Sequence, residues 1–297
     1  TARFATTPVK EILEYNVSRI KELVEAHTTT LVFVNTRNMT ETVVQKLKVA
    51  QAVGYSETAF VSSDEEADYE VSFFTPTDEV DFCGHATLAT FSTLYQIGVL
   101  TAGSYVQRTK AGMLSVNINS NGKIVMEQQL PQKLMCFSYS EISNVIGIAS
   151  NLLESTKLPI EVISTGLPDM IIPVPKGYLD LIQPNDELIA GFCKKHNIVG
   201  FHVFELCEPG SKFTASCRNF APLFGISEES ATGSSSGALA CYLTEHLALG
   251  SDFVFEQGRV MNCASIITAS VESHQSTIIN VNVGGFANSM GTLNILV

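Results

Sequence analysis

The fold is decided by DFCGHATLA, residues Asp81 to Ala89, where a polar loop gives way to an apolar run that continues to Gly98. No charged residue occurs between His85 and Leu100. An uncharged helix of that length must be buried nearly all round. Its first turn is therefore expected inside the protein, where the free N–H groups and the helix dipole make a site for an anion such as a carboxylate.

Composition and charge exclude some classes of binding partner. The chain has 297 residues and a formal net charge of -12. Because no basic cluster could neutralise phosphates, nucleic acid and anionic membranes are excluded as expected partners. No uncharged apolar stretch reaches the length of a membrane helix. We therefore expect a protein that acts on small molecules.

The cysteines indicate the compartment. Seven of them are scattered along the chain, with no C-x-x-C pair and no Cys/His cluster at metal spacing. An odd number at wide spacing favours reduced thiols over disulfides or a zinc site. The opening residues, Thr1 to Phe4, do not have the basic-then-apolar pattern of a secretion signal. These features predict a cytoplasmic protein without a metal site.

The order of the expected elements indicates two similar halves. In each half, strand-like runs surround one buried helix that follows a loop of small residues: the first follows Cys83, and the second follows Ser227–Gly237. This pattern predicts an α+β fold of two pseudo-symmetric halves, each a curved, mostly antiparallel sheet or barrel around its central helix.

The boundaries of the halves follow from the same pattern. Residues 1–129 form the expected N-terminal half, to which a C-terminal strand at residues 287–297 returns. Residues 130–286 form the C-terminal half, with the active site expected in a cleft between the two. Val9–Ala26 has apolar residues near helical spacing and is expected to form an amphipathic helix.

Six segments carry a further signal, because they follow one another in a specific order from about residue 38 to the end. They are Ser56–Val61, Cys83–Ala89, Ser164–Pro168, Arg218 with Phe220–Pro222, Ala231–Ser234 and Val283–Gly285. As an ordered set they resemble the PhzF-like isomerase family of phenazine biosynthesis, which has the diaminopimelate-epimerase-like fold. The resemblance implies a cofactor-independent isomerase, a small carboxylate-bearing substrate and a homodimer.

The resemblance implies a single carboxylate that takes a proton from carbon and returns it elsewhere on the substrate, and it assigns this role to Glu57. Glu57 precedes the apolar run Ala59–Val61, which would place it at a desolvated wall. Burial raises a carboxyl pKa towards the operating pH, as suits an acid/base shuttle. Without the resemblance, an exposed strand glutamate is the simpler interpretation.

Substrate contacts are implied at both helix starts. His85 is expected to hydrogen-bond the substrate, although a buried histidine that caps its own helix would fit the same position. Glu229 is expected to polarise or orient the substrate. The substrate-binding residues are expected to be Gly84, Ala86, Gly233 and Ser234, with the glycines allowing close approach of the backbone.

Two alternatives stay open. Racemases of the same fold use two cysteines, and Cys83 falls at the position of the first. The second falls at Ala231, which cannot transfer a proton, so Cys83 is expected to be a buried packing residue. A non-catalytic small-molecule binder is the other alternative, because Glu229-Ser230 replaces the family's usual Asp-Pro and the loop loses a rigid residue.

Overall fold

The structure is a computed structural model that describes residues 30–32, 43–289 and 291. The helix expected at Val9–Ala26 lies outside the described residues, as does most of the strand expected at 287–297. Contacts divide the chain into a first unit, which runs to Ile124 and resumes at Phe286, and a second unit, Val125–Gly285. The boundary expected from the sequence was at residue 129.

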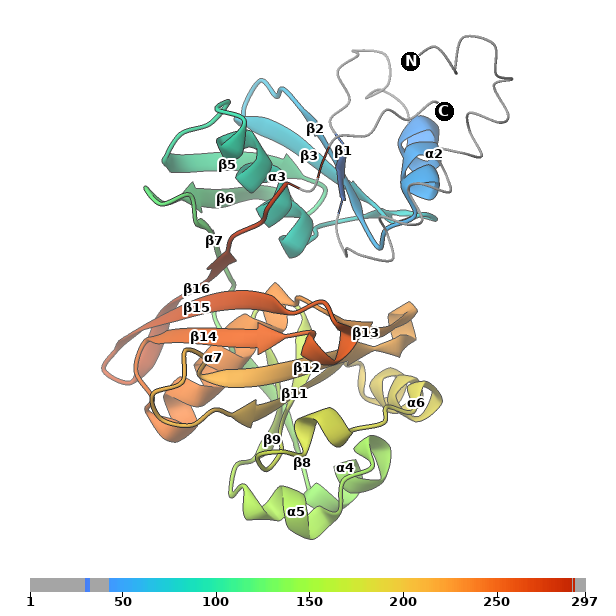
Figure 1. The fold of residues 1–297 in the computed structure, drawn as a ribbon, viewed down its shortest axis with the longest axis vertical. Coiled ribbons are helices and arrows are strands. Elements are labelled where there is room, and N and C mark those ends of the chain that lie inside the picture. Colours follow the sequence, from blue (N-terminus) through green and yellow to red (C-terminus); the bar gives the residue numbers. More distant parts are fainter. Residues whose placement is uncertain (1–29, 33–42, 290, 292–297) are drawn as a thin grey trace. The chain divides into compact units, whose positions relative to one another are not determined.

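The first unit combines helices with a mixed sheet (Figure 1). Its elements are β1 (Thr30–Val32), α2 (Val43–Val53), β2 (Thr58–Ser62), β3 (Tyr69–Phe74), β4 (Glu79–Val80), α3 (Gly84–Gln96), β5 (Gly103–Thr109) and β6 (Gly112–Ile118). The strands lie in the order β1-β2-β3-β5-β6, with β4 also on β3. The β1–β2 and β3–β5 pairs are parallel and the others antiparallel.

Helix α3 is the buried element of this unit. Every residue from Gly84 to Tyr95 is buried or half-buried, and the helix packs against β1, β2 and β6. Phe91 is fully buried and makes an edge-to-face contact with Tyr69. The expectation drawn from the missing charges is therefore confirmed, and the start of α3 lies against the interior of its unit.

The second unit has a longer sheet. Its elements are β8 (Gln132–Phe137), α4 (Tyr139–Ile146), α5 (Ser150–Ser155), β9 (Ile160–Ser164), β10 (Pro168–Pro173), α6 (Asp186–His196), β11 (Gly200–Leu206), β12 (Ala215–Ala221), β13 (Ile226–Glu229), α7 (Gly233–Leu247), β14 (Asp252–Gln257), β15 (Ser265–His274) and β16 (Thr277–Gly285), and β7 (Ile124–Glu127) leads into it. The strand order is β7-β16-β15-β14-β12-β11-β10-β9-β8, with β13 on β12. Among the described strand pairs of this unit, β10–β11 and β12–β14 are parallel.

Helix α7 is the central helix of the second unit. It packs against β9, β10, β14, β15 and β16, and Figure 1 shows it in orange beside these strands. All nine residues of Ser235–Leu243 are buried. Alternation along β10 divides the core, because Ile171 packs with α7 whereas Met170 and Ile172 pack with α4 and α6 on the other face.

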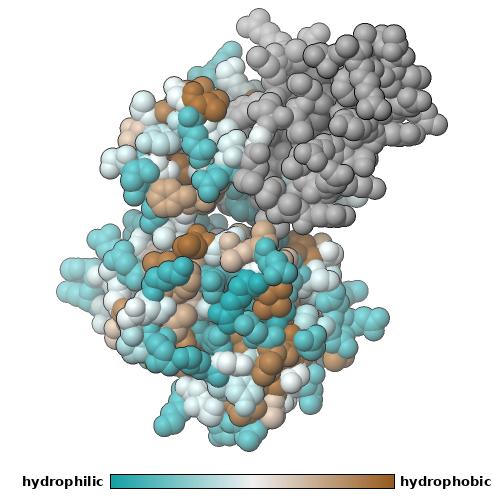
Figure 2. Space-filling view, in the orientation of Figure 1, coloured by the Kyte–Doolittle hydropathy of each residue, from teal (hydrophilic) through white to brown (hydrophobic). Residues whose placement is uncertain are grey.

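The α+β class and the helix-centred units predicted from the sequence are confirmed. Among the described helices, none is long and apolar enough to cross a membrane. On the face seen in Figure 2, hydrophobic side chains of the described part of the chain are interspersed with hydrophilic ones.

Candidate active site

Three polar side chains of the first unit meet at the start of α3. Glu57 lies just before β2, Cys83 is the residue before α3, and His85 is its second residue. His85 Nε2 lies 3.1 Å from Glu57 Oε2 and 3.5 Å from Cys83 Sγ. Cys83 is 7 % exposed, and the side chains of His85 and Glu57 are 20 % and 14 % exposed. The fold thus brings together residues 28 positions apart around one imidazole.

The charge state of Glu57 differs from the expectation. Burial does act to raise its pKa, but the hydrogen bond and positive charge of His85, with a hydrogen bond from Ser56, outweigh burial and lower the pKa below its ordinary value. The prediction of a raised pKa is therefore wrong, because it considered desolvation without the ion partner. At neutral pH Glu57 is a carboxylate, ready to accept a proton.

His85 is shifted in the opposite direction. Burial favours the neutral ring, but electrostatic and hydrogen-bond interactions with Cys83 and with Glu57 raise its pKa well above the ordinary value. His85 therefore carries the positive charge of the pair. Cys83 is a buried residue of the hydrophobic core, as expected, and its Sγ also contacts the His85 ring.

The start of α3 has no side-chain cap. Its N-cap, Cys83, is extended (φ -143°, ψ 113°) and offers no side-chain hydrogen bond to the first turn. A Cβ added to Gly84 would meet no described atom closer than Phe82 Cε1 at 3.9 Å. Packing against the described residues therefore does not require glycine at position 84, and the N–H groups of Gly84, His85 and Ala86 in the first turn of α3 can face a ligand.

The loop before α7, which corresponds in the second unit to the loop before α3, is held by hydrogen bonds to Gln257. This buried side chain donates from Nε2 to Glu229 O (2.7 Å) and to Thr232 Oγ1 (2.9 Å), and its Oε1 accepts from Thr232 N (3.3 Å). The α7 N-cap, Thr232, makes no side-chain cap. A Cβ on Gly233 would lie 3.6 Å from Val283, an ordinary contact. Ser234 is half-buried, and its carbonyl accepts from Thr165 Oγ1 at 2.9 Å.

A family model described as phenazine biosynthesis-like protein (PhzC-PhzF) matches residues 29–291. The chain belongs to this family. An uncharacterized isomerase of Clostridium acetobutylicum is 32 % identical over 255 residues, which cover 81 % of this chain and 84 % of that protein. The trans-2,3-dihydro-3-hydroxyanthranilate isomerase of Pseudomonas chlororaphis is 26 % identical, with 83 % and 86 % covered.

A solved structure has the same fold. The PhzF-family phenazine biosynthesis protein of Bacillus anthracis superimposes with a TM-score of 0.76 at 29 % identity, covering 86 % of this chain and 89 % of that one. The family resemblance drawn from the ordered segments is therefore confirmed. This PhzF-family protein is an isomerase.

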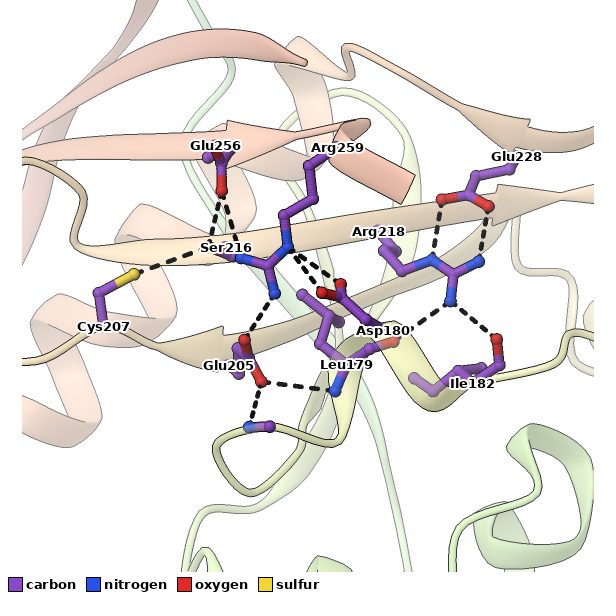
Figure 3. A network of polar contacts seen from close by, with 11 residues as sticks. Leu179, Asp180, Ile182, Glu205, Cys207, Ser216, Arg218, Glu228, Glu256 and Arg259 are labelled. Carbon is purple, nitrogen blue, oxygen red and sulfur yellow. Dashed lines mark hydrogen bonds and ion pairs between the residues drawn. The ribbon is translucent and has the colours of Figure 1, made fainter. Parts of the chain in front are cut away.

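In the second unit, Arg218 and Arg259 are at the centre of a polar network that includes Glu228 (Figure 3). Arg218 is 3 % exposed and forms a two-pronged ion pair with Glu228, while its Nη1 donates to the carbonyls of Leu179 and Ile182. Arg259 bonds Asp180, Glu205 and Glu256. Since Glu228 is the neighbour of Glu229, the Arg218 ion pair fixes the strand β13 that leads into the expected substrate loop.

Replacing Arg218 with methionine is expected to lower the free energy of unfolding by about 3 kcal/mol, because it leaves the mostly buried Glu228 carboxylate without its cation. Urea titration of wild type and variant measures the loss. The double variant Arg218→Met/Glu228→Gln is the matched control and should recover part of it. A single variant within about 0.5 kcal/mol of wild type would show that the ion pair does not stabilise β13.

A second buried cluster of this PhzF-family protein was not foreseen from the sequence. It lies between the sheet and the first turn of α7, where Ser235 Oγ donates to Asp169 Oδ2 (2.6 Å). Asn219 Nδ2 donates to Ser235 Oγ (3.1 Å) and lies 3.3 Å from His202 Nδ1. Because an amide nitrogen only donates, Nδ1 accepts and the neutral ring carries its proton on Nε2. Nε2 has no hydrogen-bond partner among the described residues.

Burial shifts both titratable members of this cluster towards their neutral forms. It raises the pKa of Asp169 to about 7, although hydrogen bonds from Ser235 and the Gly200 N–H act in the opposite direction. It lowers the pKa of His202 to about 3. The sequence carried one usable signal: Asp169 interrupts an apolar strand directly after Pro168.

Proposed function

We propose that this isomerase moves a proton between two carbons of a small carboxylate-bearing substrate without a cofactor, with Glu57 as the general acid and base. The Glu57 carboxylate takes the proton as the first C–H bond breaks, and the electron pair shifts through the substrate. The resulting carboxylic acid then gives the proton to the second carbon, which restores the carboxylate. Protonated His85 stabilises the negative charge that develops on the substrate.

The observation that carries the proposal is the 3.1 Å separation of Glu57 Oε2 and His85 Nε2 at the uncapped start of α3. A base, a cation and a turn of free N–H groups are thereby concentrated in one small region. Contacts with the part of the chain that the structure describes require glycine at neither position 84 nor position 233. Close approach of a ligand to the backbone would explain why both positions are glycine.

The second unit has a supporting role in the proposal. Gly233 and Ser234 would bind a carboxylate group and Glu229 would orient the substrate, as expected from the resemblance. A homodimer and a cytoplasmic location complete the proposal. Light scattering after size-exclusion chromatography tests the homodimer. A molecular mass equal to one chain at micromolar concentration would contradict it.

Proton transfer can be followed directly in heavy water. We would incubate the protein with trans-2,3-dihydro-3-hydroxyanthranilate, the compound named for the Pseudomonas chlororaphis relative, and with a panel of other small unsaturated carboxylates. Nuclear magnetic resonance should show product formation or deuterium at one carbon of at least one compound. Activity should persist after dialysis against EDTA. Exchange that requires an added cofactor would contradict the proposal.

A thiol-dependent racemase is the second candidate, and one observation favours it. Cys83 Sγ lies 3.5 Å from His85 Nε2, as in a cysteine activated by a neighbouring imidazole. If Cys83 transfers the proton, Cys83→Ser should lose about 10²-fold or more of the exchange rate. If Glu57 does, we expect Cys83→Ser to stay within about tenfold of wild type, because the carboxylate and imidazole remain.

A further inference from the structure

Glu57, Cys83 and His85 bring together three atoms of kinds that bind metal ions, a grouping that the sequence did not reveal. A thiol sulfur, an imidazole nitrogen and a carboxylate oxygen, from Cys83, His85 and Glu57, all lie within 4.8 Å of one another. Two of these separations are 3.5 Å and 3.1 Å. The sequence has no Cys/His cluster at metal spacing, but spacing takes no account of a fold that brings Glu57 to the Cys-x-His turn.

The separations match one class of cation. Bonds from Zn²⁺ to sulfur, nitrogen and oxygen are about 2.0–2.3 Å long, so tetrahedral ligands lie about 3.3–3.7 Å apart. The distances from His85 Nε2 to Glu57 and to Cys83, 3.1 and 3.5 Å, need changes of only a few tenths of an ångström, and the remaining pair, Glu57 and Cys83, lies within 4.8 Å. Mg²⁺ and Ca²⁺ prefer sets made only of oxygen, whereas a mixed sulfur, nitrogen and oxygen set suits Zn²⁺.

A second observation points to a ligand at the same place. Glu57 Oε2 is buried, and beyond its 3.1 Å contact with His85 Nε2 it has no hydrogen-bond partner among the described residues. Buried carboxylate oxygens are normally satisfied. A cation would satisfy this oxygen while the partial exposure of His85 and Glu57 leaves a route in.

We propose that Glu57, Cys83 and His85 form a Zn²⁺ site, and that Zn²⁺ bound there inhibits the isomerase. Three protein ligands leave a fourth position open, as in other accessible zinc sites. As the metal binds, the thiol of Cys83 and the imidazolium of His85 lose their protons to water, and the sulfur and nitrogen lone pairs bind the metal.

Inhibition, unlike binding, rests on the proposed function. Zn²⁺ would occupy the carboxylate oxygen that has to accept the substrate's proton. The site is therefore a regulatory one, at which a thiophilic divalent cation and the substrate exclude each other. Raising the substrate concentration should lower the degree of inhibition.

Binding is tested with Co²⁺, which takes zinc sites and reports thiolate ligation through a near-ultraviolet charge-transfer band. Full-length metal-free protein is titrated with Co²⁺, and we expect one equivalent to produce the band and Zn²⁺ to abolish it. Cys83→Ser should remove the band, and His85→Ala should weaken binding by about tenfold or more. A band that survives in Cys83→Ser, or a titration without saturation, would overturn the site.

Cys136→Ser is the matched control. Cys136 is an exposed cysteine whose Sγ lies 3.8 Å from Glu161 Oε1, so it also has a carboxylate neighbour but is not part of the three-ligand set. The Co²⁺ band should be unchanged in this variant. If the band is lost there instead, the metal binds at Cys136 and the proposal fails.

Turnover separates the two proposals. Inhibition of exchange by stoichiometric Zn²⁺, reversed by EDTA, supports both the site and the role of Glu57. Absence of the Co²⁺ band overturns the metal site. It does not bear on the catalytic role of Glu57, which the Glu57→Gln substitution tests separately. A Co²⁺ band without inhibition by Zn²⁺ overturns the inhibitory role and counts against Glu57 as the base.

Discussion

Replacing Glu57 with glutamine is expected to slow deuterium incorporation by roughly 10²–10⁴-fold, the usual contribution of a positioned general base. Glutamine has nearly the same shape and can still bond His85, but its amide cannot accept a proton from carbon. The rate is measured in heavy water with the carboxylate that the wild type exchanges fastest. The affinity for that compound, measured by calorimetry, should change far less than the rate.

Glu70→Gln is the control for this substitution. Glu70 is an exposed glutamate on β3 of the same unit, and its Oε2 accepts from Ser62 Oγ at 3.2 Å. Its loss should leave exchange unchanged. A Glu57→Gln enzyme as active as the Glu70→Gln enzyme would remove Glu57 from the mechanism and favour Cys83.

The pH profile of kcat/KM carries a related expectation, because it reports the free enzyme. His85 lowers the pKa of Glu57, so the base stays ionised, and the acidic limb of the profile should lie below the ordinary pKa of a glutamate. The pKa of His85 is raised, so the alkaline limb should lie well above that of an ordinary histidine. Activity limbs at ordinary values would mean that the ion pair does not persist in solution.

Asp169→Asn and His202→Gln are expected to change the slope of the free energy of unfolding against pH in opposite directions. The carboxyl of Asp169 titrates near pH 4 when unfolded and near pH 7 when folded. Between these values the folded protein binds more protons, so stability falls as pH rises. His202 titrates near pH 6.5 unfolded and near pH 3 folded, so its contribution rises with pH over that range.

The two effects oppose each other between about pH 4 and 6.5, each with a slope of up to about 1.4 kcal/mol per pH unit. Asp169→Asn should leave the rising contribution of His202, so that stability relative to wild type increases with pH, by up to about 3 kcal/mol across this range. His202→Gln should show the reverse. Denaturant titrations at a series of pH values measure both, and the double variant should follow the wild-type slope. Parallel curves for all four proteins would show that neither group is neutralised by burial.

Much of the fold followed from local patterns. The missing charges after His85 predicted α3, and alternating or continuous apolar runs predicted strands such as β9 and β11 at the observed bounds. Strand β8 was missed for a physical reason. It forms one edge of the sheet and is largely exposed, so its sequence lacks an alternation of buried and exposed residues.

The candidate site was predicted less completely. The resemblance selected Glu57 and His85, which the structure places 3.1 Å apart. The roles of Glu229, Gly233 and Ser234 stay predictions. Spacing could not show that Cys83 shares the imidazole, because the third member of that cluster comes from 26 residues earlier, and long-range pairing is set by the sheet. The interior position of Asp169 was missed because a charged residue is ordinarily assigned to the surface.

The backbone next to Glu229 bears on how this carboxylate would reach a substrate. The Ser230 N–H lies 3.3 Å from Glu229 Oε1, a donor that the Asp-Pro pair usual in the family lacks, since proline has no N–H. The Glu229 side chain is thus hydrogen-bonded to its own backbone. If Glu229 orients the substrate as proposed, it must first break that hydrogen bond, and substrate binding then includes a cost that a proline at position 230 would remove.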